Sequence, residues 1–220
     1  MTTIPIRPFA AAKLLTFAAL ALGGCHISGI RGNGHITTEP RPVQEFTSVE
    51  AEGAFDIEWV PGPASCTIRT DENLLSHVET AMSGSKLELR WHGQLRPTHG
   101  MKVRLSSSKL ISTRLTGAVR LSATRIEGKA FYIDGTGATR VTVDGTVDDL
   151  MATMTGASKL MADSLQVRNA ELSISGAGKA EVSVSDSLKV AISGAGKVTY
   201  RGNPKVERQI SGAGSVRQRD

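Results

Sequence analysis

A tripeptide of Ser or Thr, then Gly, then Ala recurs six times in the second half of this chain. Its central residues are Gly117, Gly137, Gly156, Gly176, Gly194 and Gly212, which are 20, 19, 20, 18 and 18 residues apart. Such a short, regular period is typical of stacked repeats, in which each repeat contacts only its neighbours. Each position of the repeat should therefore form a row along the stack.

Aligning the repeats on this glycine places apolar residues at positions of the same parity. Two residues before the glycine stand Leu115, Met154, Ile174, Ile192 and Ile210, with Gly135 as the exception. Four residues after it stand Leu121, Val141, Leu160, Ala180, Val198 and Val216, and six after it stand Ala123, Val143, Ala162, Val182, Tyr200 and Gln218. Side chains of one parity share a face of an extended chain. We predict that these three rows face the core.

A period of 18–20 residues fits one coil of a β-solenoid. Propeller blades need about 40 residues, and the drift of the period breaks the spacing of a left-handed hexapeptide helix. The chain is predicted to be all-β, a right-handed parallel β-helix with coils of about 18–20 residues. Earlier alternating runs, such as Lys86–Trp91, predict further strands. Helical periodicity is poor, except for one short helix or turn at Asp71–Val78, with Asp71 as its N-cap.

The N-terminus has the layout of a lipoprotein signal. A basic start with Arg7 and Lys13 precedes an apolar run that is too short to span a bilayer. The following Leu22-Gly23-Gly24-Cys25 resembles a bacterial lipobox, which implies that Cys25 is lipidated and anchors the chain to a membrane. An ordinary signal peptide is the alternative. Because His26 follows and not Asp, the resemblance implies an exported outer-membrane lipoprotein of the cell envelope, facing the periplasm or the cell surface.

The chain is expected to contain one folded domain. Residues 1–24 are predicted to be the signal peptide, 25–42 a flexible tether rich in Gly and Pro, and 43–220 a single β-helix domain. Within that domain, residues 43–110 form an irregular N-terminal part and 111–217 the regular repeats. Cys66 has no partner once Cys25 is lipidated, so we expect a buried free thiol and no disulfide.

Several motifs together resemble one known bacterial envelope family. They are Gly32-Asn33-Gly34, Gly53-Ala54-Phe55-Asp56-Ile57-Glu58, Asp71-Glu72-Asn73-Leu74-Leu75 and the serial Ser-Gly-Ala-Gly-Lys. In this order they are similar to the auto-transporter adhesin head domain, or GIN domain, over about residues 32–217. The resemblance implies a β-helix, no established catalytic residues and an adhesive role of unknown ligand. The early repeats depart from the Ser-Gly-Ala-Gly-Lys pattern, because Val119, Thr139 and Ser158 replace its second glycine. The binding surface along the repeats is therefore not expected to be uniform.

The candidate ligand surface lies beside the repeat glycines. Three residues after them stand five cations, here named the basic row: Arg120, Arg140, Lys159, Lys179 and Lys197. One residue before them stands the hydroxyl row: Thr116, Thr136, Thr155, Ser175, Ser193 and Ser211. In-register coils would align both rows, which could bind sulfate, phosphate or uronate groups of a polymer. Alternatively, the cations only keep a strand face solvated and the hydroxyls satisfy backbone groups near the turn.

Catalysis is the weakest interpretation. All five histidines precede the repeats, which excludes a repeat-borne His base or zinc ligand. Carboxylates of a glycan-cleaving site could come from Asp144, Asp148, Asp149 and Asp163, but adjacent Asp148 and Asp149 would face opposite ways on a strand. The Gly-rich motif lacks the frame of a phosphate-binding loop. We expect no enzyme activity, cofactor, metal or nucleic-acid partner.

The sequence therefore favours a non-catalytic, lipid-anchored envelope protein that presents a β-helical surface for adhesion or for binding an anionic polysaccharide. The net charge of +5 permits such binding but does not establish it. A structural or sensory lipoprotein with a protein partner is the alternative, and a polysaccharide-active enzyme is a third. The C-terminal end of the stack is either protected by charged residues or pairs with a second copy of the chain as a homodimer.

Overall fold

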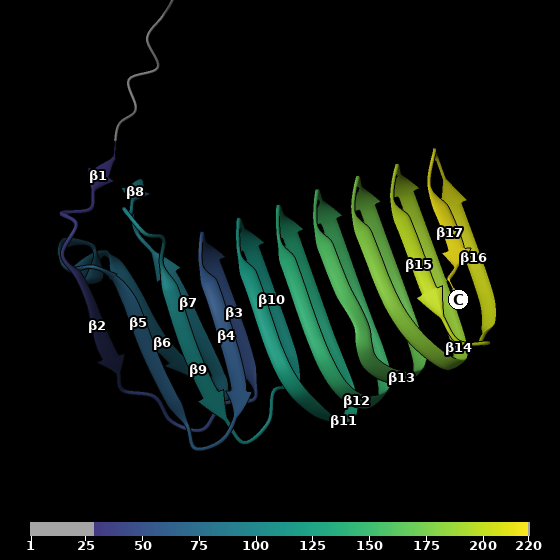
Figure 1. The fold of residues 1–220 in the computed structure, drawn as a ribbon, viewed down its shortest axis with the longest axis horizontal. Helices are drawn as coiled ribbons and strands as arrows, with labels where there is room; N and C mark the ends of the chain where they lie inside the picture. The colour runs from purple at the N-terminus through teal and green to yellow at the C-terminus, as the bar shows by residue number, and fades with distance from the viewer. Residues whose placement is uncertain (1–28, 220) are drawn as a thin grey trace, which may run out of the picture.

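The computed structural model describes residues 29–219 and is a parallel β-solenoid of about 5 turns, with 72% strand and 3% helix (Figure 1). This confirms the predicted β-helix. Cys25 and the signal segment 1–24 lie outside the described residues. None of the helical segments within residues 29–219 has the length and hydrophobicity that a membrane-spanning helix needs.

Each regular coil is one long strand that bends in its middle. The four such strands are β11 (Arg120–Gly137), β12 (Arg140–Gly156), β13 (Lys159–Gly176) and β14 (Lys179–Gly194). Both halves of β12 pair in parallel with the matching halves of β11 and β13. The second halves, which end at the repeat glycines, form what we name sheet 1, and the first halves form sheet 2. In Figure 1 the glycine corners make the upper edge and the rounded bends the lower edge.

Shorter strands extend both sheets to the ends of the solenoid. Sheet 1 runs through β6 (Val78–Ser83), β7 (Lys86–Trp91), β3 (Ser48–Gly53) and β10 (Ser112–Gly117), then the long strands, to β16 (Lys205–Ser211). Sheet 2 runs through β2 (Ile36–Arg41), β5 (Ser65–Asp71), β9 (Lys102–Ser107) and β4 (Asp56–Pro61) to β15 (Lys197–Arg201) and β17 (Ser215–Gln218). The outermost strands β2, β5 and β6 pair antiparallel and close the N-terminal end.

The coils at this end do not stack in chain order. β3 lies between β7 and β10, and β4 lies between β9 and β11. Residues 48–61 therefore form a coil that is enclosed by two coils that come later in the sequence. A smaller pair, β1 (Ile30–Arg31) and β8 (Leu95–Arg96), and the 3-10 helix η1 (Glu72–His77) complete the cap.

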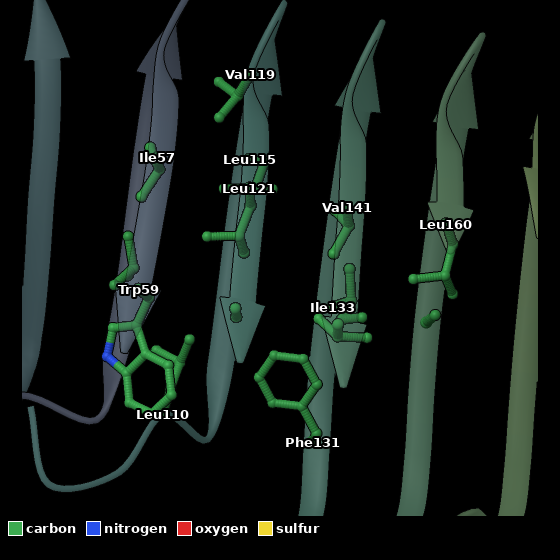
Figure 2. Close-up of a cluster of buried hydrophobic side chains, with 14 of the residues drawn as sticks. Ile57, Trp59, Leu110, Leu115, Val119, Leu121, Phe131, Ile133, Val141 and Leu160 are labelled. Carbon is green, nitrogen blue, oxygen red and sulfur yellow. The ribbon is translucent and has the colours of Figure 1, made fainter. Parts of the chain in front are cut away.

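The predicted apolar rows form the core between the two sheets. Ile57, Leu121, Val141 and Leu160 pair in register on successive coils and are at most 1% exposed (Figure 2). The exceptions belong to the last coil, where Ile210 is 38% exposed because no further coil covers it. The side chains of Trp59 and Cys66 are also buried, as predicted, and burial raises the pKa of the Cys66 thiol to about 11.

The repeat glycine is required at the corner for two reasons. At Gly137 φ is +104°, and a Cβ there would lie 2.7 Å from the carbonyl oxygen of Gly117 on the coil below. The following amide, of Ala138, donates a hydrogen bond of 2.9 Å to that same carbonyl. A side chain at this position would therefore separate the coils where the backbone ladder turns.

The second glycine position faces the core and not the surface. Val119, Thr139, Ser158, Gly178 and Gly196 are all buried. A Cβ at Gly178 would lie 2.9 Å from Cγ2 of Ile174, whereas a Cβ at Gly135 would lie 2.6 Å from Oγ1 of Thr139. At both of these corners the residues two before and two after the corner share one space, so the side chain at one position is matched by a glycine at the other. The departures noted in the early repeats are core packing and leave the outer face unchanged.

The structure corrects two expectations at the N-terminal end. Residues 36–41, assigned from sequence to a tether, form β2 and pair with β5, so the folded part begins earlier. Asp71 does precede η1, but its side chain makes no cap hydrogen bond. Its carboxylate instead accepts hydrogen bonds from the backbone N–H groups of Gly34 and Thr98 and from the Thr98 hydroxyl, each 2.8 Å long.

Candidate functional site

The basic row is aligned in register along the outer face of sheet 2. Arg120 pairs with Arg140, Arg140 with Lys159, Lys159 with Lys179, and Lys179 with Lys197. Lys159 is half-buried and the other four are exposed. Parallel neighbours lie about 4.8 Å apart, so the five cations span about 19 Å. The predicted alignment of the row is therefore present.

No ion pair neutralises this row within residues 29–219, although other cations of the described chain do have carboxylate partners. Arg201 lies 3.9 Å from Asp163, for example, and Arg219 lies 3.7 Å from Glu181. The row ends at Asp56, which pairs with Arg120 in register, and at Ser215. Like charges directly opposite each other on neighbouring strands repel. A bound polyanion would relieve that repulsion.

The hydroxyl row is also in register, but it lies on the other side of the corner. Thr155 pairs with Ser175, Ser175 with Ser193 and Ser193 with Ser211, all on the outer face of sheet 1. Lys179 and its equivalents lie on sheet 2, after the corner. The two rows therefore leave the upper edge of the solenoid in Figure 1 on opposite sides, and they do not form one continuous strip.

A different hydroxyl, that of Ser158, bonds to the corner backbone and in turn accepts a hydrogen bond from Thr139. Thr139 donates to Ser158 Oγ at 2.9 Å, and Ser158 Oγ lies 3.1 Å from the carbonyl oxygen of Thr155. Both side chains are buried at the second glycine position. Their place in an inward-facing row is the sequence signal that could have identified this role.

The four candidate carboxylates are engaged by residues of other coils. Asp144 accepts a hydrogen bond of 2.6 Å from the Arg125 amide, and Asp149 accepts one of 3.0 Å from Asn169. Asp148 lies 4.0 Å from Arg168, and Asp163 pairs with Arg201. Across residues 29–219, no three His, Cys, Asp or Glu side chains gather as a metal site would require. These contacts link one coil to another.

The outer face of sheet 1 holds exposed apolar residues that the repeat alignment did not single out. Tyr132 is 42% exposed and Met151 is 43% exposed, and the two pair in register on neighbouring coils. Both lie five residues before a repeat glycine, where the parity of the position predicts an outward side chain. This parity is the sequence signal from which the exposure of both side chains could have been predicted.

The open C-terminal end carries a charge in a core-facing row. Arg208 of β16 pairs with the buried Val190 of β14 and lies between the half-buried Val206 and the exposed Ile210 in their row. Gln218 similarly occupies the row of Tyr200 and donates a hydrogen bond of 2.7 Å to the Gly202 carbonyl oxygen. Charged and polar residues at such positions oppose edge-to-edge pairing.

Solved structures support the fold. A "putative adhesin" from Bacteroides fragilis superposes with a TM-score of 0.70 at 18% identity, covering 86% of this chain and 100% of that one. A "putative lipid binding protein" from Parabacteroides distasonis gives a TM-score of 0.50 at 20% identity, covering 88% and 100%. At these identities the likeness concerns the fold alone. None of the curated proteins compared with the chain matches it.

The family profile described as "Putative auto-transporter adhesin, head GIN domain" matches residues 45–204. The match spans the enclosed coil, all the long strands and the cap except β1 and β2. It agrees with the resemblance carried by the sequence motifs. The chain belongs to the auto-transporter adhesin head GIN-domain family.

Proposed function

We propose that this protein is a non-catalytic, lipid-anchored protein of the cell envelope that binds an anionic surface polymer through the basic row. The observation that carries the proposal is the register of five cations from Arg120 to Lys197, which have no ion-pair partner within residues 29–219. Aligned cations offer an extended polyanion several contacts at once, so weak single contacts add up along the row.

The position of the chain's described start supports an anchored arrangement. Gly29 and β1 lie at the capped end of the solenoid, and the C-terminus lies at the opposite end (Figure 1). The basic row runs along the axis between these ends. A lipid on Cys25, inserted in the outer membrane, would hold the capped end at the membrane and let the row point away from it.

Charge neutralisation tests the basic row. The soluble domain, residues 26–220, would carry Arg140→Gln, Lys159→Gln, Lys179→Gln and Lys197→Gln together, with alginate and lipopolysaccharide as probes. The control replaces four exposed lysines elsewhere with Gln: Lys109, Lys129, Lys189 and Lys205. We expect the row variant to lose at least tenfold in affinity and most of its salt dependence, and the control to bind nearly as the original does.

Equal losses in the two variants would show that only net charge matters and would remove the basic row as a site. Binding of neither probe by the original domain would reject the anionic polymer as the ligand. The anchor has a separate test in Cys25→Ser, which should abolish labelling by fatty acid and membrane attachment. Continued labelling of that variant would refute lipidation at Cys25.

A further inference from the structure

Sheet 1 carries a hollow of about 520 Å³ on its outer face, far from the basic row, which lies on sheet 2. Residues from four successive coils line it: Ser48, Ser112, Tyr132, Met151, Arg114 and Asp134. Lys86 and Glu50 border it toward the N-terminal cap.

The shape of the hollow follows from one row of the repeat. In register along sheet 1 lie Lys86, Ser48, Ser112, Tyr132 and Met151. Two small serines thus stand between longer side chains, with the Ser112 hydroxyl 2.8 Å from that of Ser48. At about 4.8 Å per strand, Lys86 and Tyr132 are separated by about 14 Å. The gap between them can admit a pyranose ring and the start of its neighbour.

The apolar part of the hollow consists of two exposed side chains on neighbouring coils. Five large hydrophobic residues are exposed within residues 29–219, and two of them, Tyr132 and Met151, line the hollow and pair in register. Single exposed apolar residues need no explanation, whereas a group with a polar rim is typical of a binding site.

The polar rim is balanced in charge and held in place. Arg114 lies 3.5 Å from Asp134, and the Lys86 ammonium lies 2.8 Å from Glu50. The hydrogen bond donated by Lys86 also holds the pKa of Glu50 below its usual value, so this carboxylate stays ionised near neutrality. Two cations face two anions, which gives a polyanion no net attraction. The rim instead offers paired donors and acceptors.

We propose that this hollow binds a neutral sugar unit of a surface glycan, with one pyranose face against the Tyr132 ring and its hydroxyls hydrogen-bonded to Arg114 and Asp134. Sugars present apolar C–H faces and hydroxyls that both donate and accept, which matches an exposed aromatic beside an Arg–Asp pair. An apolar peptide fits less well, because it would remove water from two ion pairs and offer them no hydrogen bonds in exchange. This site is independent of the basic row.

The test titrates the soluble domain, residues 26–220, with neutral hexasaccharides built from glucose, N-acetylglucosamine, mannose or xylose, by calorimetry. We expect binding to at least one of them, with salt between 50 and 300 mM changing the affinity by less than about twofold. Tyr132→Ser, which copies the serine of the preceding coil, should weaken binding by roughly fivefold to tenfold. Asp134→Asn should also weaken it. Lys189→Gln, in the same row two coils beyond Met151, serves as the matched control.

Several outcomes would overturn the proposal. They are no binding of any hexasaccharide, unchanged binding by Tyr132→Ser, or competition for the site by an apolar peptide and not by a sugar. A separate variant, Ser112→Arg, fills the hollow without removing any wall, so binding that survives it would place the sugar elsewhere. The variant lacking four cations of the basic row should bind neutral sugars normally. A failure of the neutral-sugar proposal can therefore be distinguished from a failure of the anionic-polymer proposal.

Discussion

A Cβ added to Gly156 would lie 2.6 Å from the carbonyl oxygen of Gly137 on the preceding coil. The Ala157 N–H donates a hydrogen bond of 2.8 Å to the same oxygen, so the corner belongs to the ladder that joins the coils. The repeated glycine is therefore a stacking residue as much as a turn residue.

The first prediction separates these two roles. Gly156→Ala should lower the free energy of unfolding by roughly 3 kcal/mol, through backbone strain at φ +91° and the contact with Gly137. Gly84 also has a positive φ, +61°, but a Cβ there meets nothing within 4 Å. Gly84→Ala should therefore cost only about 1–2 kcal/mol. Urea unfolding followed by circular dichroism measures both, and equal losses would contradict the stacking role.

The second prediction concerns Ile174 and Gly178, which share one space in the core. Gly178→Ala should destabilise by about 1–3 kcal/mol because its Cβ would meet Ile174 Cγ2 at 2.9 Å. Ile174→Ala removes that methyl group and should cost about 2–5 kcal/mol by itself. The double variant should cost less than the sum by about 1 kcal/mol. A double-mutant cycle measures this coupling, and strict additivity would argue against shared packing.

The third prediction is a pH dependence at the capped end. Burial alone would raise the pKa of Asp71, but the hydrogen bonds from Thr98 and Gly34 outweigh it and hold the pKa below its usual value. The resulting stability is present above the unfolded pKa of about 4 and is lost as pH falls through the lower folded pKa.

Hydrogen exchange of the β2 amides should therefore accelerate at the acid end more than exchange in β13. Asp71→Asn should cost about 2 kcal/mol at pH 7 and remove this selective acid effect. An equally strong acid effect in Asp71→Asn would assign it to other groups.

The fourth prediction concerns the open end. The soluble domain should sediment as a monomer because Arg208 stands in a core-facing row beside Val206 and Ile210. Arg208→Val together with Gln218→Val would make that end apolar and should produce concentration-dependent association. Sedimentation equilibrium at several concentrations tests both statements. A dimer of the unaltered domain would instead favour the C-terminal interface.

The regular coils were predictable because inward rows such as Leu121, Val141 and Leu160 repeat with a constant parity. The same register predicted the alignment of the basic row. Strand β2 was not predictable, since Ile36 is its only large apolar residue and its order comes from antiparallel pairing with β5. The separation of Ser175 from Lys179 by the corner was also missed, because a linear alignment does not show that the chain turns from one sheet to the other between them.

The exposure of Tyr132 could be deduced from parity, but the hollow beside it could not. It depends on Ser48 lying next to Ser112, two residues 64 positions apart in the chain. That neighbourhood exists only because residues 48–61 are enclosed by later coils, an order that no local pattern encodes.

The enclosed coil also sets the sequence of events in assembly. Residues 48–61 precede in the chain their partners on both sides, β7 with β9 and β10 with β11. We therefore expect the N-terminal half to remain open until about residue 123 is available, and its long-range pairing to be the slow step. After that step, each of β12, β13 and β14 can add to a finished edge as it arrives. Folding would thus nucleate in the N-terminal coils and then proceed by the addition of one coil at a time.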